Sequence, residues 1–232
     1  MIKIALCFYG QPRYVNNVDV PKSYAKFFNR SDYKVESFGH CWYSKNAVYS
    51  SSSWTQNHED YTADDNTVNA LYNYYNFTRL LVERPKTFRF NDESFRERYR
   101  QVKHHINYNE QRENNTLSQL YSIETVSKLV PDTFDYYVLC RYDTVLTGIP
   151  DFNLLDPNLL YLPDCGIFSD IVIIFSKKYL QWSRNYYTLS QEKLFDIEGF
   201  MPEEFKKHVY LDLGYNVNDA RLVNMFGHIV RN

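Results

Sequence analysis

Two short polar stretches of the sequence combine residue types that bind phosphate groups and metal ions. One runs from Gly10 to Arg13 (GQPR) and the other from Arg141 to Asp143 (RYD), and each follows an apolar run. An arginine guanidinium forms paired hydrogen bonds with phosphate or carboxylate oxygens. An aspartate carboxylate binds hard cations such as Mg²⁺ or Mn²⁺, which often share their ligands with a substrate phosphate. The two stretches therefore suggest a site for a phosphorylated ligand.

Each stretch also has a simpler interpretation. Residues 10–13 fit an ordinary turn with a surface arginine, in which Gly10 permits a positive φ and Pro12 stiffens the loop. Arg141 and Asp143 would share one face of a continued strand and form an ion pair. The phosphate-binding patterns G-x-x-x-x-G-K-[ST] and G-x-G-x-x-G are absent from the sequence, so we do not expect a Rossmann dinucleotide site.

Two histidines are further candidates. His40 lies two residues before Trp42 in the run ESFGHCW, so their side chains share one face if the strand continues through them. Both residues would serve equally well as core side chains. His228, close to the C-terminus, is either a late metal ligand or a residue of a disordered tail. These alternatives stay open on the sequence alone.

The elements that must position these residues alternate between strands and helices, which predicts an α/β fold with a mostly parallel sheet. The run FDYYVLC before Arg141 is apolar throughout, so we expect a central strand that is buried on both faces. Further strands are predicted at 2–9, 33–42, 79–86, 159–164 and 170–178, and helices at 20–31, 67–76, 115–130, 178–190 and 202–213.

Ligands of open α/β sheets bind beyond the carboxyl ends of the strands. The polar groups at residues 10–13 and 141–143 each follow a predicted strand, and residues 39–42 end one, so we expect the three groups to meet at one edge of the sheet. Residues 43–66 have no clean period and are expected to form a long loop, as lids and binding loops often do. The charged stretch 88–112 is expected to form a solvated helix or an ordered excursion, with its basic run exposed rather than binding phosphate.

Composition excludes several classes of protein. The 232 residues suit one domain, 1–232, and a formal net charge of -2 argues against a nucleic-acid partner. The sequence contains neither a stretch of roughly 20 apolar residues nor an N-terminal signal pattern, so we expect no membrane span and a cytoplasmic location. The four cysteines form no C-x-x-C pair, and we expect reduced core residues at Cys7, Cys41, Cys140 and Cys165.

Seven segments taken together resemble a group of small GT-A-like glycosyltransferases found in viruses, phages and bacterial surface-polysaccharide clusters. They have the order and spacing of that group and cover most of the chain except 43–66 and 88–112. The segments are KIALCFYGQPR, ESFGHCW, LLVERPKTF, SQLYSIETVSKL, DYYVLCRYDTVL, FSDIVIIFSKKYL and MPEEFKKHV. The resemblance implies a single GT-A-like (Rossmann-like) domain with a mixed, mostly parallel sheet. It also implies a nucleotide-sugar donor at the carboxyl edge and a divalent cation at the donor's diphosphate.

The resemblance also implies roles for individual residues. Asp143 would hold Mn²⁺ or Mg²⁺ together with His228, at the last position of a D-x-D-like motif whose first aspartate is replaced here by Arg141. Arg141 would instead neutralise diphosphate charge. Asp170 would contact donor hydroxyls or act as the catalytic base, and Glu203 is the second candidate base unless it only stabilises a helix N-terminus. The donor would be lined by Gly10, Gln11, Arg13, His40, Trp42, Ser118, Gln119 and Arg141.

We therefore expect a glycosyltransferase that moves a sugar from a nucleotide-sugar donor, a UDP-sugar, to a hydroxyl acceptor such as a glycan. The alternative is a non-catalytic protein that binds nucleotide sugars without turnover, which the arginine at position 141 would favour. A third possibility, a tyrosine-rich structural or adhesion protein, would leave Arg13, His40 and Asp143 far apart in space.

Overall fold

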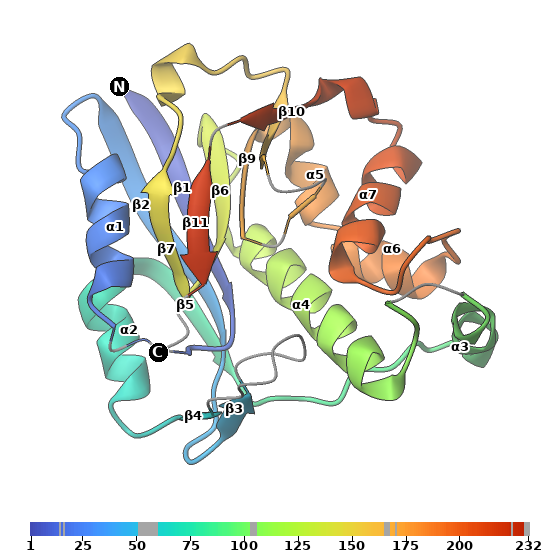
Figure 1. Cartoon of the computed structure of the whole chain (residues 1–232). Helices are drawn as coiled ribbons and strands as arrows, with labels where there is room; N and C mark the ends of the chain where they lie inside the picture. The colour runs from blue at the N-terminus through green and yellow to red at the C-terminus, as the bar shows by residue number, and fades with distance from the viewer. Residues whose placement is uncertain are drawn as a thin grey trace.

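The computed structural model describes residues 1–13, 15, 17–50, 60–102, 106–164, 168–169, 171–223 and 225–229. Its centre is a seven-stranded sheet with the strand order β10-β8-β9-β6-β1-β2-β5 (Figure 1). The strands of this sheet are β1 (Ile2–Gly10), β2 (Tyr33–Trp42), β5 (Phe77–Glu83), β6 (Tyr136–Arg141), β8 (Leu160–Pro163), β9 (Val172–Ser176) and β10 (Ala220–Val223).

The sheet is mixed and mostly parallel, which confirms the predicted fold class. Strands β6, β1, β2 and β5 run parallel to one another, and β10 runs parallel to β8. Strand β9 is antiparallel to both of its neighbours, β6 and β8. From β1 the chain proceeds through β2 to β5 on one side and then returns to form β6 on the other side of β1. The topological switch point of the sheet therefore lies between β1 and β6.

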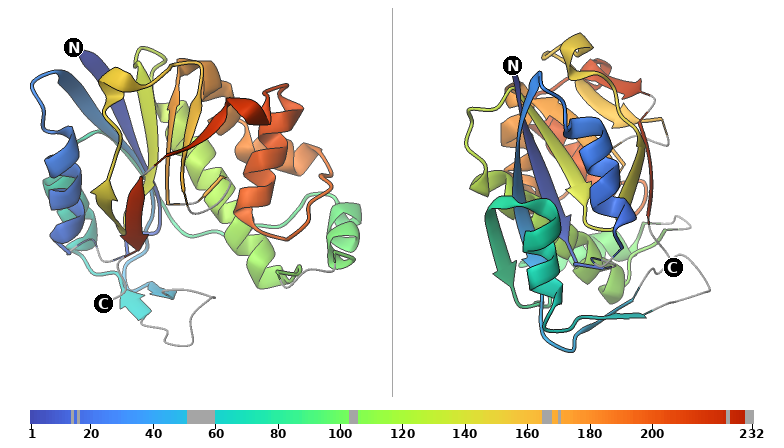
Figure 2. Two further views of the ribbon diagram at one scale, coloured as in Figure 1. Left: turned by 45° about the horizontal axis from the view of Figure 1, so that its top comes forward. Right: turned by 90° about the vertical axis from the view of Figure 1, so that its left-hand side faces the viewer.

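Helices cover both faces of the sheet (Figure 2). One face carries α1, α2 and a small antiparallel pair formed by β7 and β11, and the other carries α4 to α7. These elements are α1 (Asp19–Phe28), α2 (Thr67–Tyr75), α4 (Glu110–Leu129), α5 (Leu180–Ser183), α6 (Tyr186–Glu192), α7 (Pro202–Asp212), β7 (Thr144–Gly148) and β11 (Phe226–Ile229). The described residues also contain the short 3-10 helices η1 (Phe152–Leu154), η2 (Lys177–Tyr179) and η3 (Val217–Asp219).

The two faces of the sheet belong to two separate hydrophobic clusters. Successive side chains of a strand point to opposite faces, so Ala5 and Cys7 of β1 pack with the α4 side while Leu6 and Phe8 pack with the α1 side. Strand β6 divides in the same way. This double burial explains why both strands are continuous apolar runs in the sequence, as predicted for the central strand.

Several of the predicted segments differ from the structure in their bounds; the strand predicted at 79–86, for example, is β5 at Phe77–Glu83. Helix α4 begins five residues before the predicted 115, because the side chain of Asn109 caps it by accepting a hydrogen bond from the Arg112 amide at 2.8 Å. The long loop predicted at 43–66 contains two short antiparallel strands, β3 (Val48–Ser50) and β4 (Asp60–Thr62), and residues 51–59 lie outside the described residues.

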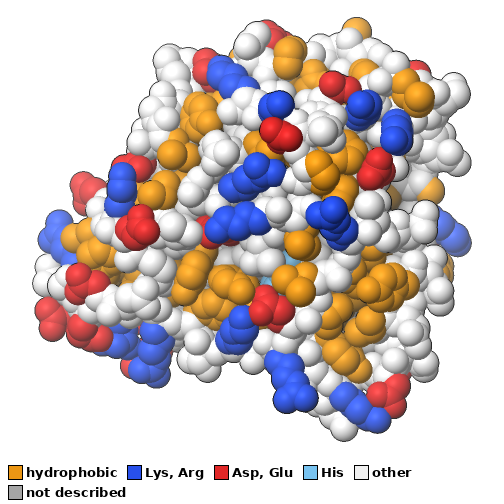
Figure 3. All heavy atoms as spheres, turned by 180° about the vertical axis from the view of Figure 1, so that it is seen from behind, with side chains coloured by type: hydrophobic (Ala, Val, Ile, Leu, Met, Phe, Trp, Pro, Cys, Tyr) orange, Lys and Arg blue, Asp and Glu red, His pale blue; other side chains and the backbone are white. Residues whose placement is uncertain are grey.

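The cysteines agree with the expectation where the structure describes them. Cys7, Cys41 and Cys140 are buried free thiols, and Cys165 lies outside the described residues. On the face shown in Figure 3, basic and acidic side chains are interspersed. Among the helices that the structure describes, none combines the length and the apolar composition needed to cross a membrane.

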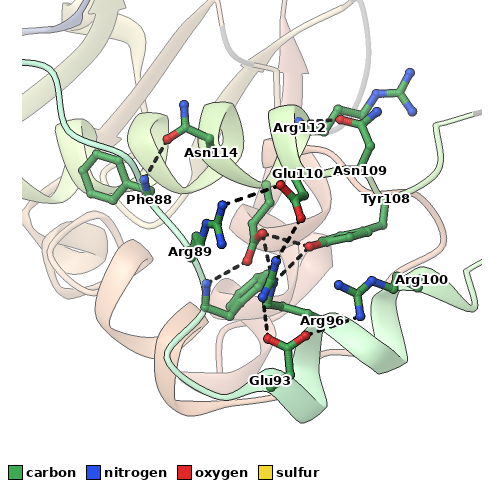
Figure 4. A network of polar contacts seen from close by, with 12 residues as sticks. Phe88, Arg89, Glu93, Arg96, Arg100, Tyr108, Asn109, Glu110, Arg112 and Asn114 are labelled. Carbon is green, nitrogen blue, oxygen red and sulfur yellow. Dashed lines mark hydrogen bonds and ion pairs between the residues drawn. The ribbon is translucent and has the colours of Figure 1, made fainter.

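The described residues of the charged stretch, 88–102 and 106–112, form an excursion around α3 (Glu93–Arg100) that packs against the start of α4 (Figure 4). Arg98 and Arg100 are exposed, as predicted for this basic run. The prediction is wrong for Arg96, which is only 8% exposed. Its guanidinium forms ion pairs with the glutamates Glu93, Glu110 and Glu113.

Candidate functional site

The polar groups that follow β1, β2 and β6 come together at one edge of the sheet, the lower edge in Figure 1. In the strand register, Gly10 lies opposite Cys41 of β2, and Tyr9 lies opposite both His40 of β2 and Arg141 of β6. These strands are parallel, so their carboxyl ends share this edge. The edge also contains the topological switch point between β1 and β6, the place where open α/β sheets bind their ligands.

The loop after β1 leaves the sheet at a glycine with a left-handed backbone. Gly10 has a φ of 102° and its amide donates a hydrogen bond to the Ser122 hydroxyl of α4 at 2.9 Å. A side chain on Gly10 would meet no atom within 4 Å, so the backbone conformation rather than crowding favours glycine here. Beyond it, Arg13 Nε donates to Gln11 Oε1 at 2.7 Å. Gln11 and Arg13 are half-buried at the switch point.

His40 is fully buried at the end of β2, and both of its ring nitrogens have protein partners. Nδ1 lies 2.6 Å from the Ser122 hydroxyl and Nε2 lies 3.0 Å from Glu83 Oε2. Glu83, the last residue of β5, also accepts hydrogen bonds from Lys86 Nζ at 2.6 Å and from the Tyr121 hydroxyl at 3.1 Å. A direct contact between His40 and a nucleotide stays a prediction, since this imidazole already bonds within the protein.

The surroundings shift the pKa of two of these groups downward. Burial lowers the pKa of His40 below its ordinary value of 6.5, although the hydrogen bond with Glu83 opposes the shift. Burial raises the pKa of Glu83, but hydrogen bonds from Lys86 and His40 outweigh this and lower it overall. At neutral pH the imidazole is therefore neutral and the carboxylate is ionised.

The low pKa of His40 predicts how stability depends on pH. Below pH 6.5 the unfolded chain binds a proton that the folded chain takes up only at lower pH, so stability falls as the pH falls through this window. Between about pH 7.5 and about pH 5.5, we expect the free energy of unfolding to fall less in His40→Gln than in the wild type. Urea unfolding at the two pH values should show a difference of up to about 1 kcal/mol between the two proteins. Equal losses in the two proteins would contradict the assignment. The other histidines are common to both proteins.

Trp42 belongs to an aromatic cluster beside this network. It is 3% exposed, its ring packs edge-on against His40 at 4.6 Å, and it stacks on Tyr121 at 5.5 Å. The Lys86 ammonium lies over the rings of Trp42 and Tyr121, at 5.7 and 4.9 Å from their centroids. The buried indole Nε1 has no hydrogen-bond partner in the described part of the chain. Packing therefore accounts for most of the contacts of Trp42.

Arg141 and Asp143 form an ion pair, which was the simpler of the two interpretations of these residues from the sequence. Arg141 Nε donates to Asp143 Oδ1 and Nη2 donates to Oδ2, both at 2.8 Å. Asp143 is only 2% exposed, while Arg141 is half-buried at the end of β6. The pair places a guanidinium beside the strand end that neighbours Gly10.

Ser118 and Gln119 lie on α4, one turn before Ser122. Both residues are half-buried. The amide nitrogen of Gln119 is buried without a hydrogen-bond partner among the described residues. A buried amide without a partner costs free energy, so this nitrogen is a group that a bound ligand or water would satisfy. A contact between these two residues and a donor remains a prediction.

The remaining predicted site residues are only partly described. Asp170 lies outside the described residues, although β9 begins two residues later with Val172 opposite Cys140 of β6. Glu203 lies in the first turn of α7, where a carboxylate is favoured by the helix dipole. The backbone of His228 pairs with Val145 in the ladder of β7 and β11. This register brings the C-terminal strand to the residues that directly follow Asp143.

The described part of the chain contains no complete set of ligands for the expected metal ion. Within these ranges, no group of three or more His, Cys, Asp or Glu side chains is arranged to hold a metal ion. Both carboxylate oxygens of Asp143 accept hydrogen bonds from Arg141, which competes with a cation for the same lone pairs. A cation at Asp143 would therefore have to open this ion pair, and we derive no chemical step from one.

Ser122, His40 and Glu83 are the residue types of a hydrolytic triad, but their arrangement does not suit that chemistry. A nucleophilic serine must reach a substrate carbonyl. Ser122 and His40 are both 0% exposed, and the Ser122 hydroxyl already accepts the Gly10 amide. The three residues therefore organise the sheet edge and do not act as a nucleophile and its base.

Four residues of this edge were not identified from the sequence: Glu83, Lys86, Tyr121 and Ser122. Glu83 and Lys86 flank Pro85 at the end of a predicted strand, and Tyr121 and Ser122 lie in a predicted helix. One of them could have been identified from the sequence. Ser122 is four residues after the predicted site residue Ser118, so the two share a face of the predicted helix.

No family model matches the sequence, and no curated protein matches it. Among solved structures, apo-form glycosyltransferase GlyE of Streptococcus pneumoniae TIGR4 aligns with a TM-score of 0.41 and 13% identity, over 92% of this chain and 43% of GlyE. The bifunctional glycosyltransferase WbbM aligns with a TM-score of 0.43 and 10% identity, over 96% of this chain and 38% of WbbM. The chain thus spans less than half the length of these proteins, and its function must be argued from its own site.

Proposed function

We propose that the chain is a glycosyltransferase that transfers a sugar from a nucleotide-sugar donor, a UDP-sugar, to a hydroxyl group of an acceptor. The observation that supports this best is the placement of Arg13 and Arg141 after β1 and at the end of β6, on the two sides of the topological switch point. Two guanidinium groups at this position suit the diphosphate of a nucleotide sugar. The sequence resemblance to small glycosyltransferases points to the same ligand.

The proposed reaction forms a bond between the acceptor oxygen and the anomeric carbon of the sugar. The bond from that carbon to the diphosphate breaks, and UDP leaves with the electron pair. Arg13 and Arg141 would stabilise the negative charge that grows on the leaving diphosphate, as preorganised cations do in other transfer reactions. The acceptor proton would pass to a carboxylate, for which Asp170 and Glu203 are the candidates.

Metal dependence is a separate part of the proposal. The candidate ligands remain Asp143 and His228, and a cation there would have to displace the bonds that Arg141 makes to Asp143. That ion pair also favours the alternative of a protein that binds nucleotide sugars without turnover. The two functions differ in one result, since the alternative predicts UDP-sugar binding without release of UDP when acceptors and Mn²⁺ are supplied.

The proposal is tested by thermal unfolding of the whole chain with UDP, GDP and CDP, each with and without Mn²⁺. We expect UDP to raise the melting temperature, because a ligand that binds only the folded state stabilises it. Arg13→Ala should weaken UDP binding by about tenfold through the loss of a charge-assisted hydrogen bond. Arg98→Ala is the control, since this arginine is exposed on α3, away from the sheet edge.

The outcomes separate the parts of the proposal. A wild-type protein whose melting temperature does not respond to any nucleotide would contradict the donor assignment. Asp143→Ala should abolish any additional rise in melting temperature caused by Mn²⁺. If this rise persists in the variant, Asp143 is not a metal ligand. Equal UDP affinities for Arg13→Ala and Arg98→Ala would remove Arg13 from the site.

A further inference from the structure

A continuous row of hydrogen bonds crosses the sheet edge from β5 to the end of β1. It runs from Glu83 through His40 and Ser122 to the backbone amide of Gly10, with donor–acceptor distances of 3.0, 2.6 and 2.9 Å. We propose that Glu83, His40 and Ser122 are positioning residues that hold the Gly10 amide and thereby fix the loop that binds the donor's phosphates. The hydrogen bonds stand on the structure alone, and the consequence for the ligand rests on the proposed function.

The chemistry of the groups gives every hydrogen bond in this row a direction. The ionised carboxylate of Glu83 can only accept, so Nε2 of His40 must carry a proton and donate it. The imidazole is neutral, so Nδ1 has a lone pair and accepts from the Ser122 hydroxyl. That hydroxyl has donated its only proton, and its oxygen is left to accept from the Gly10 amide. Each group is in the one state that satisfies both of its neighbours.

The outer end of the row is held by two further groups. Lys86 Nζ and the Tyr121 hydroxyl both donate to Glu83, which keeps the carboxylate ionised and oriented toward His40. Lys86 also lies over the Tyr121 ring, so these groups hold each other in place. Such outer partners fix both the tautomer and the orientation of a histidine.

The inner end of the row acts on the residue at which the chain leaves the sheet. Gly10 is the last residue of β1, and its left-handed φ turns the chain out of the sheet toward Gln11 and Arg13. Its amide is fixed by α4 through Ser122, while β2 and β5 supply His40 and Glu83. The row therefore links three elements, α4, β2 and β5, to one peptide group of β1. Loss of a link would let the loop move relative to Arg141, the other arginine of the switch point.

The decisive variants are two serine substitutions on the same helix. Ser122→Ala removes the acceptor of the Gly10 amide. Ser127→Ala is the matched control, because Ser127 is also buried in α4 but its hydroxyl has no hydrogen-bond partner in the described part of the chain. Hydrogen exchange at the Gly10 amide and UDP titration are measured on both variants and on the wild type.

We expect Ser122→Ala to raise the exchange rate of the Gly10 amide by about tenfold and to weaken UDP binding by about fivefold, the effect of one lost hydrogen bond. Ser127→Ala should change neither quantity. Unchanged Gly10 exchange in Ser122→Ala would overturn the hydrogen-bond row whether or not UDP binds. Raised exchange with an unchanged affinity would overturn its role in ligand positioning. If the wild type does not bind UDP, the proposed function fails while the exchange data still decide the row.

A second pair of variants tests the outer end without altering the buried serine. Nitrogen NMR of His40 should show a protonated Nε2 and a bare Nδ1 in the wild type. Glu83→Gln retains an acceptor for Nε2 and should preserve this tautomer, whereas Glu83→Ala should shift the proton toward Nδ1 and raise Gly10 exchange. An unchanged tautomer and unchanged exchange in Glu83→Ala would show that Glu83 does not control the row.

Discussion

Arg96→Met is expected to lower the free energy of unfolding by about 3–5 kcal/mol, the range found when one partner of a buried ion pair is removed. The substitution keeps the aliphatic volume of the side chain and removes its charge. Glu113 would then be left at 0% exposure without the guanidinium that faces it at 3.3 Å. Urea unfolding monitored by circular dichroism measures the loss.

The arrangement around Arg96 explains why the effect should be this large. The guanidinium also donates to the Tyr108 hydroxyl at 3.1 Å, and this hydroxyl donates to Glu113 at 2.8 Å (Figure 4). Glu113 further accepts the backbone amide of Phe90 at 2.8 Å. Hydrogen bonds, led by the one to Tyr108, raise the pKa of Arg96, so its charge persists at every pH where the protein folds. The network joins the excursion around α3 to α4 through the buried carboxylate of Glu113.

Arg98→Met is the matched control on the same helix. Arg98 is exposed, and its change should stay within about 0.5 kcal/mol of the wild type. The double variant Arg96→Met with Glu113→Leu should recover part of the loss, because a buried ion pair can be replaced by apolar groups more cheaply than it can be broken. Equal losses for Arg96→Met and Arg98→Met would contradict the account.

The same residue shows a limit of reading the charged stretch from sequence. The segment FRERYR contains three arginines with a spacing of two, and nothing in that spacing marks Arg96 as the buried one. Its burial depends on Glu113, seventeen residues away on another helix. A contact of this kind depends on how α3 packs on α4, so it cannot be predicted from the pattern of charges in the sequence.

The sheet could be predicted more fully than its edge. Double burial makes β1 and β6 nearly continuous apolar runs, and these runs predicted the strand ends that carry Gly10 and Arg141. The alternation of strands and helices predicted the mostly parallel sheet, and the family resemblance implied that it is mixed. The supporting residues gave no comparable signal. Glu83 and Ser122 are polar residues in ordinary positions of a strand and a helix, and only the pairing of β2 with β5 and the packing of α4 on the sheet bring them to His40.

A glycine in the middle of this edge gives the second large expected effect. Gly39 precedes His40, and a Cβ built on it would lie 2.6 Å from Leu80 Cδ1, 2.7 Å from the Tyr142 hydroxyl and 2.9 Å from Phe77 Cε1. All three distances are shorter than real Cβ contacts, so Gly39→Ala must displace the side chains of Leu80, Tyr142 and Phe77. We expect a loss of about 3 kcal/mol in the free energy of unfolding, at the upper end of the cost of overpacking a core.

Gly214→Ala separates this steric effect from the general cost of replacing a glycine. Gly214 has a φ of 80° and open space around its missing Cβ, so only backbone strain of about 1 kcal/mol is expected there. Gly39→Ala should also weaken UDP binding in protein that is still folded, because a displaced His40 no longer orients Ser122 toward Gly10. Equal destabilisation by the two substitutions would mean that the side chains around Gly39 move without a cost in free energy. The edge of the sheet would then be too flexible to hold the Gly10 loop in the way we propose.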